Sequence, residues 1–202
     1  MRKILFTFIV LSILQSCNRK EKPLKYVEIK KEYGANKAQQ IMAEKFYYSV
    51  IDEFAPFGND MGNDTFYLYS DWIQENSDKN ALLFLQENLK DLGNAYASFD
   101  LRTDAKNRNY LIQEVSRLPD QYVALNRIDS IIIALAFTQL FLEGKIDKGI
   151  NILAQIAIDR ELAFVEFWKE DGKERSDKLN IMLSDLKKTE GTSSRDNNSS
   201  TK

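Results

Sequence analysis

Histidine is absent from this chain of 202 residues, and cysteine occurs only once, at Cys17. Without histidine there is no Ser-His-Asp triad, no Cys-His dyad and no His-ligated metal site. With a single cysteine there is no disulfide within the chain and no Cys-clustered zinc site. Catalysis would therefore have to use carboxylates, lysine, tyrosine, serine or threonine.

The chain also lacks a strong excess of charge of either sign. It carries 28 basic and 30 acidic side chains, and the basic ones form no stripe or patch. Proteins that bind nucleic acid usually present such a basic surface. We therefore expect no nucleic-acid partner. The hydrophobic fraction of 44% is typical of a globular chain with a real core.

The first residues have the features of a targeting segment. Arg2 and Lys3 give a positive start, and an apolar run of eleven residues follows from Ile4 to Leu14. A secretory signal has a hydrophobic region of this length, whereas a transmembrane helix needs about 20 residues. The stretch LQSC, which ends at Cys17, resembles the bacterial lipoprotein box, with Leu three places and a small residue one place before the cysteine.

This resemblance implies that residues 1–16 are a cleaved signal peptide and that Cys17 becomes the lipidated first residue. The alternative is an uncleaved signal anchor with an incidental cysteine. Each buried acyl methylene contributes about 0.8 kcal/mol, and one chain anchors only marginally. A mature bacterial lipoprotein carries two or three chains, so we expect stable extracytoplasmic attachment to a membrane of the bacterial cell envelope.

The rest of the chain divides into three parts. Residues 17–35 are rich in charge and include a proline and a glycine, which predicts a flexible tether. Residues 189–202 are polar and rich in serine and asparagine, which predicts a disordered tail. Residues 36–188 show helical periodicity and almost no alternation of period two. We therefore predict an all-α fold, with about six to eight helices in a single compact domain.

Several helix ends have recognisable signals. Pro56 should end the first helix, because the residue before a proline is pushed out of the helical region. Gly93 should stop the third helix. Asp147 should cap the helix that begins at Asp147 itself, over residues 147–158. The apolar stretch Ile131–Phe137 is typical of a helix at the centre of a helical domain. The predicted helices cover residues 36–54, 64–74, 79–92, 105–117, 127–144, 147–158, 161–169 and 176–187.

The stretch DEFAPFGNDMGNDTFYLYSDW, residues 52–72, combines glycines, a proline, two Asn-Asp pairs and several aromatic side chains. One interpretation is mechanical: Pro56 and Gly58 turn the chain, and a polar side chain then accepts the free amides of the next helix. The candidate caps are Asn59, Asp60, Asn63 and Asp64. Aromatic side chains would dock that helix into the core: Phe57, Phe66, Tyr69 and Trp72.

Two functional interpretations of the same stretch stay open. An EF-hand calcium loop starting at Asn59 fails, because Met61 and Ser70 occupy its third and twelfth positions, but a non-standard cation site with Asp60 and Asp64 remains an alternative. The second functional interpretation is a carboxylate pair for hydrolysis, which needs two acidic side chains about 5–9.5 Å apart. We assign no catalytic residue, metal ligand or cofactor. The candidate binding residues are Glu53, Phe57, Asn59, Asp60, Asp64 and Trp72.

The stretch resembles the signature of the YfeS-like bacterial proteins, which carry a similar run D-E-x-x-P-F-G-S/N-D-x-G-x-D before a helix. Together with the later ELAFVEFWKEDG, it is also similar to the domain of unknown function 4259, where an F-x-N-D opening precedes an E-L…L-W-E segment. Here the interval between Glu161 and Trp168 is longer than usual, and an Ile-rich helix replaces an Ala-rich one. The resemblance covers about residues 40–187 and implies a shared fold, but neither family brings a known reaction.

The sequence therefore predicts a lipid-anchored bacterial envelope protein that acts as a non-enzymatic helical binding module. Its expected partners are the membrane, through the N-terminal lipid, and a protein, as for an immunity or accessory protein that binds a toxin or envelope component. The alternative function is a carboxylate- or metal-dependent hydrolase that uses the loop between Asp52 and Asp64.

Overall fold

The computed structural model describes residues 28–190. Cys17, the predicted signal peptide and most of the predicted tether and tail lie outside these residues. The described part contains α-helices and short 3-10 helices and no β-strand, so the all-α prediction is confirmed. The α-helices are α1 (Asn36–Ile41), α2 (Asp60–Glu75), α3 (Ala81–Leu92), α4 (Asn94–Ser98), α5 (Arg108–Val115), α6 (Tyr122–Glu143), α7 (Lys148–Ala163) and α8 (Gly172–Glu190). The 3-10 helices are η1 (Lys31–Tyr33), η2 (Lys45–Tyr48) and η3 (Val165–Asp171).

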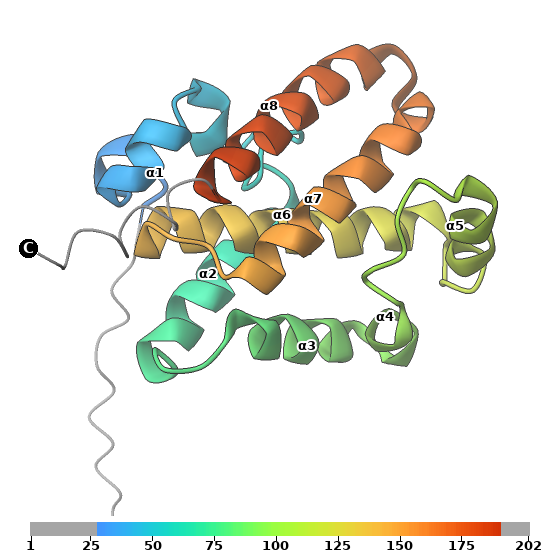
Figure 1. Ribbon diagram of the computed structural model, residues 1–202, viewed down its shortest axis with the longest axis horizontal. Helices are drawn as coiled ribbons and strands as arrows, with labels where there is room; N and C mark the ends of the chain where they lie inside the picture. The colour runs from blue at the N-terminus through green and yellow to red at the C-terminus, as the bar shows by residue number, and fades with distance from the viewer. Residues whose placement is uncertain (1–27, 191–202) are drawn as a thin grey trace, which may run out of the picture.

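Helix α6 lies at the centre of the domain. In Figure 1 it crosses the middle of the molecule, and it packs against α1, α2, α3 and α7. By length and composition it could cross a membrane, but 83% of its most apolar window is buried inside the domain. An apolar helix that other helices surround in this way is a core helix, as the sequence predicts.

After α6, the chain forms α7, η3 and α8, which complete the domain. Gly144 adopts the left-handed conformation (φ 70°) and ends α6, a role that glycine fills without steric cost. The chain then runs through α7, turns at η3 and returns as α8 alongside α7 (Figure 1). The predicted helix over 161–169 is wrong, since most of that segment is the 3-10 helix η3. The other helix ends differ from prediction by up to five residues.

The predicted helix over residues 36–54 is also wrong. Helix α1 stops at Ile41, η2 is a separate short turn, and residues 49–59 form a loop. Side chains bind the backbone of this loop: the Ser49 hydroxyl accepts from Asp52 N at 3.1 Å, and Asp52 Oδ1 accepts from Phe54 N at 3.1 Å. Such local hydrogen bonds compete with helical ones.

The segment 28–35, predicted as the end of the tether, lies against the domain. Ile29 is buried, and Ala35 N donates to Phe141 O of α6 at 2.8 Å. Ile29 stands between Glu28 and Lys30, and the segment has no helical apolar stripe that would predict its burial. At the other end, α8 extends two residues past the predicted boundary at 188.

Asp147 caps a different helix from the predicted one. Its side chain makes no cap hydrogen bond to α7, which follows it. Instead, Asp147 Oδ2 accepts from Ala81 N at 3.1 Å, at the start of α3. The free amides at a helix start take whichever acceptor the tertiary fold brings to them.

Candidate functional site

A turn at residues 52–64, here called the acidic turn, forms the first wall of the candidate site. Asn59 caps α2, since its Oδ1 accepts from Gly62 N at 2.9 Å. Both glycines of the turn meet backbone at close range: a Cβ on Gly58 would lie 1.8 Å from Asp52 O, and one on Gly62 would lie 2.1 Å from Pro56 O. Only glycine fits such approaches. The mechanical interpretation of this stretch is therefore confirmed for the turn and the cap.

An ion pair and an aromatic contact hold the acidic turn against the end of the chain. Lys178 Nζ of α8 lies 2.6 Å from Asp52 Oδ2 and sits over the ring of Phe54. Phe54 is itself buried, and its ring meets that of Trp168 in η3 edge-on, with the centroids 5.3 Å apart. The turn is thereby fixed to segments more than a hundred residues away in the sequence.

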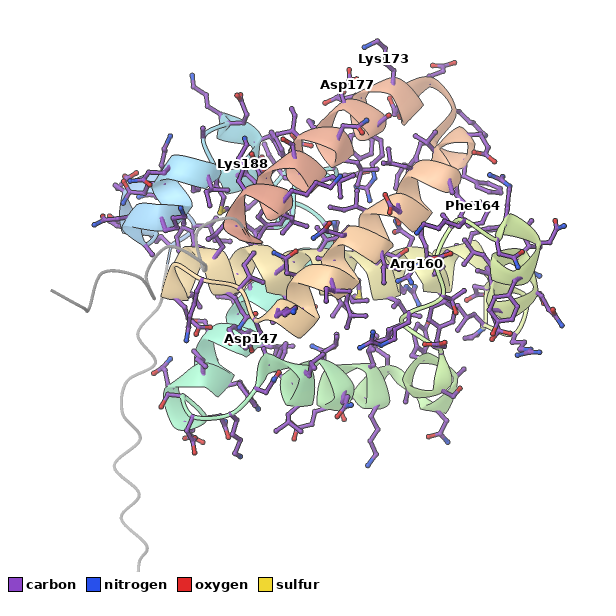
Figure 2. All side chains as sticks on the ribbon, in the orientation of Figure 1. Asp147, Arg160, Phe164, Lys173, Asp177 and Lys188 are labelled. Carbon is purple, nitrogen blue, oxygen red and sulfur yellow. The ribbon has the colours of Figure 1, made fainter. Side chains whose placement is uncertain are left out.

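A fully buried ion pair joins α6 to α7 behind this wall. Arg160 Nε donates to Asp129 Oδ1 at 3.0 Å, and both side chains are sealed from solvent. Arg160 Nη1 donates to the carbonyl oxygens of Leu101 and Thr103, and Figure 2 shows Arg160 on the stretch of α7 that lies next to α6. Burial raises the pKa of the Asp129 carboxyl to about 7, and the Arg160 guanidinium opposes that rise. Protein partners thus occupy most donors of Arg160.

A second buried ion pair joins α7 to α8. Arg175 Nη2 and Nε donate to Glu161 Oε2 at 2.7 and 3.3 Å, while Glu161 Oε1 accepts from Asn126 Nδ2 at 2.8 Å. The Arg175 guanidinium lies over the Trp168 ring, 5.0 Å from its centroid, and the side chain is 4% exposed. Its Nη1 has no hydrogen-bond partner within residues 28–190. Arg175 is therefore held rigidly with one donor group to spare.

The acidic turn, α6, η3 and α8 enclose a cleft of about 310 Å³, here called the charged cleft. Four charged side chains line it, two of each sign: Glu53, Asp60, Arg127 and Arg175. The cleft is also lined by Asn59, Asn126, Ser130 and Trp168. A small-molecule site typically has a volume of about 300–1,000 Å³ and a few convergent polar groups. The charged cleft lies at the lower end of that range and is unusually polar.

Two further hollows flank the charged cleft. The apolar hollow, of about 270 Å³, shares Asn126 and Trp168 with it and is otherwise lined mainly by Tyr122, Val123, Leu125, Phe164 and Phe167. The outer hollow is wider, about 670 Å³, and lies beyond the start of α2. It shares residues 58–61 with the charged cleft and adds Val50, Asn63, Asp64 and Tyr67.

The structure brings three of the six predicted binding residues together. Glu53, Asn59 and Asp60 line the charged cleft. Asp64 is exposed and lines the outer hollow. It is not the cap of α2, because that role belongs to Asn59.

The two aromatic residues predicted for the site lie elsewhere. Phe57 is fully buried and packs edge-on against Phe66, with the ring centroids 5.1 Å apart. Trp72 stacks on Tyr69 and donates from Nε1 to Glu87 at 3.2 Å, away from the charged cleft. Both therefore serve the docking of α2, which the mechanical interpretation predicts.

Sequence reasoning missed the half of the charged cleft that α6 and α8 supply. Asn126 and Ser130 are four residues apart, so they lie on one face of α6, and Arg127 and Arg175 complete the set. A signal was present: polar residues at helical spacing within an otherwise apolar helix. Arg175 had no local signal, since it lies in a segment rich in charge.

The arrangement suits the binding of a ligand that carries charge. Opposite charges face one cleft, and Trp168 lines it. Within residues 28–190, no group of three acidic side chains lies where it could share a metal ion. Comparison with known protein families, with curated proteins and with solved structures gives no match. The resemblance to the YfeS-like proteins and to domain 4259 stays a prediction, and the chain's own residues carry the functional argument.

Proposed function

We propose that this protein is a lipid-anchored binding protein of the bacterial envelope and that its ligand occupies the charged cleft. One observation carries the binding part of the proposal: four charged side chains from the acidic turn, α6 and α8 line a single cleft. The anchoring part rests on the LQSC stretch and Cys17, which lie outside the described residues.

The charges at the cleft support a binding role. Within the described part of the chain, Glu53, Asp60 and Arg127 make no ion pair, although ten ion pairs are present there. Charges of this kind are available to a ligand, and complementary charge gives a binding site its selectivity and speed of association. The rigid setting of Arg175 adds preorganisation, which lowers the entropy cost of binding.

A carboxylate-based hydrolase is a second candidate, because Glu53 and Asp60 line the same cleft. The metal-dependent version has less support. It would use Asp60 and Asp64, which both line the outer hollow, but no third acidic side chain joins them within residues 28–190.

The test compares what the anchored protein retains from envelope extracts. Full-length protein is purified in detergent in three forms: wild type, Arg127→Glu and Arg102→Glu. Arg127 and Arg102 are both exposed, and the charge reversal at Arg127 removes only a long hydrogen bond, from Nη1 to the Tyr96 hydroxyl at 3.3 Å. All three forms should therefore fold alike, which melting temperatures check. We expect the wild type and Arg102→Glu to retain a component that Arg127→Glu loses, because the reversed charge faces the cleft.

Two results would contradict this proposal. One is identical retention by all three forms. The other is turnover of an ester, amide or glycoside that depends on Glu53 or Asp60, which would favour the hydrolase.

A further inference from the structure

The charged cleft and the apolar hollow adjoin each other, and their chemistry differs sharply. Asn126 and Trp168 line both of them and form their common wall. The apolar hollow is built from an aromatic cluster. The ring centroid of Tyr122 lies 4.7 Å from that of Phe164 and 4.3 Å from that of Phe167. Phe167 remains 54% exposed. A ligand that filled both spaces would need a polar head and an apolar side group.

Within the cleft, the donors come from α6 and α8. Arg175 is more than nine-tenths buried and keeps Nη1 without a partner in the described part of the chain. Ser130 is 6% exposed, and its hydroxyl also lacks a partner there. That hydroxyl is open to solvent, because within residues 28–190 only the Thr103 hydroxyl is both sealed from solvent and without a partner. Arg127 is exposed beside them, and its Nη1 donates to the Tyr96 hydroxyl at 3.3 Å, so Nε and Nη2 are its donors for a ligand. Guanidinium and hydroxyl donors in this combination match a carboxylate.

The acceptors come mainly from the acidic turn. Glu53 and Asp60 are exposed carboxylates that make no ion pair within residues 28–190. Asn126 gives one of its two amide hydrogens to Glu161, and its carbonyl oxygen Oδ1 can accept from a ligand. Two carboxylates and an amide oxygen match an ammonium group.

We propose that the cleft binds an α-amino acid with a large apolar side chain. Its carboxylate meets Arg127, Ser130 and Arg175, and its ammonium group meets Glu53 and Asp60. The side chain enters the apolar hollow past Trp168. This inference rests on the proposed function and names the ligand class of the same cleft.

The experiment uses the position of Trp168 between the two spaces. The chain has two tryptophans, so Trp72→Phe leaves Trp168 as the only source of tryptophan fluorescence. Full-length protein with this change is titrated with L-phenylalanine, and we expect a saturable change in emission. Ligands that lack one group should bind at least about tenfold more weakly. A lost charged group leaves its partner in the cleft unpaired, and a lost side group leaves the apolar hollow unfilled. These ligands are 3-phenylpropionate without the ammonium group, phenethylamine without the carboxylate and glycine without the side group.

Variants assign each end of the ligand. Arg127→Gln should weaken the binding of L-phenylalanine and 3-phenylpropionate but not that of phenethylamine. Glu53→Gln should weaken the binding of L-phenylalanine and phenethylamine but not that of 3-phenylpropionate. Arg102→Gln is the matched control and should change nothing. A flat titration overturns the inference, and so does equal affinity for all four ligands. If phenethylamine alone binds as tightly as L-phenylalanine, the carboxylate contributes nothing, the cleft is an amine site and the inference is also overturned.

The two proposals fail in different ways. If Arg127→Glu loses an envelope component while the phenylalanine titration is flat, the ligand class is wrong and the binding function stands. If the titration saturates but retention from envelope extracts is identical in all forms, the site binds amino acids and the envelope partner is wrong. If both results are negative, both proposals are overturned.

Discussion

At the residue scale, the buried ion pair between Asp129 and Arg160 is costly to break. Both side chains are fully buried, so each has given up its hydration. Such a pair contributes little net stability compared with apolar residues, but breaking it leaves one charge buried and alone. The pair links α6 to α7, and the carbonyls of Leu101 and Thr103 tie the 99–107 connection to it.

Removal of one partner should therefore be severe and removal of both should be milder. We expect Arg160→Met to lower the free energy of unfolding by about 3–5 kcal/mol, because Asp129 is left unpaired. Adding Asp129→Leu should recover a large part of that loss, though not all, since Leu101 and Thr103 still lack their donor. Urea unfolding measures all three proteins. A cost below about 1 kcal/mol for the single change contradicts this account.

The same carboxyl should impose a dependence of stability on pH. Burial raises the pKa of Asp129 from 3.8 to about 7. Its folded pKa lies above its unfolded pKa, so the folded state binds more protons between about pH 4 and pH 7. This carboxyl therefore lowers the free energy of unfolding as the pH rises through that window, and the loss is complete above pH 7.

The double variant Arg160→Met/Asp129→Leu isolates this effect, because the remaining carboxylates are common to both proteins. The difference in unfolding free energy between wild type and variant should shift by on the order of 4 kcal/mol across the window. The wild type should lose stability relative to the variant as the pH rises from about 4 to about 7. Above pH 7 the difference should stay constant. A difference that does not vary from pH 4 to pH 7 would show that the carboxyl keeps its ordinary pKa.

At the scale of elements, the start of α2 depends on one side chain. Asn59 → Ala removes the acceptor for Gly62 N and should cost about 0.5–2 kcal/mol. Asp64→Ala is the matched control: Asp64 is exposed and caps nothing, so we expect a change within about 0.5 kcal/mol. Thermal and urea unfolding compare the two. A larger loss for Asp64→Ala would mean that the cap has been assigned to the wrong residue.

The helix-cap role of Asp147 gives a prediction for α3 instead of α7. Asp147→Ala should speed hydrogen exchange at Ala81 N and the first turn of α3, because that amide loses its acceptor. The first turn of α7, which directly follows Asp147 in the sequence, should exchange with less change. Exchange measured by NMR or mass spectrometry resolves the two helices. Faster exchange confined to α7 would contradict the assignment.

At the scale of the whole molecule, the prediction concerns the anchor. Cys17 → Ser removes the only thiol that could accept a lipid. We expect the precursor to stay uncut, larger by residues 1–16, while the wild-type protein partitions into detergent and incorporates a labelled fatty acid. Two or three acyl chains are not released by salt, so a wild-type protein washed off membranes by salt contradicts lipidation. Normal maturation of Cys17→Ser contradicts it too. Circular dichroism should find the helical domain alike in both forms.

The local sequence determined the helical class and most of the helices, because burial of an apolar face leaves a period of about 3.6 residues in the chain. It also determined that α6 is central, since no other segment of residues 36–188 is apolar on nearly every side, and that His-based chemistry is excluded. The ends at Gly93 and Gly144 were predicted to within a residue, because glycine acts on its own backbone.

Tertiary structure alone decided where the polar groups meet. Asp147 caps α3, Arg175 pairs with Glu161, and Lys178 reaches Asp52, and none of these contacts leaves a local pattern in the sequence. The sequence singled out Glu53 and Asp60 as a possible site but not the arginines that face them. Helical periodicity reports which side of a segment is buried and not which partner lies across from it. The charged cleft exists because the fold brings the acidic turn, α6 and α8 to one place.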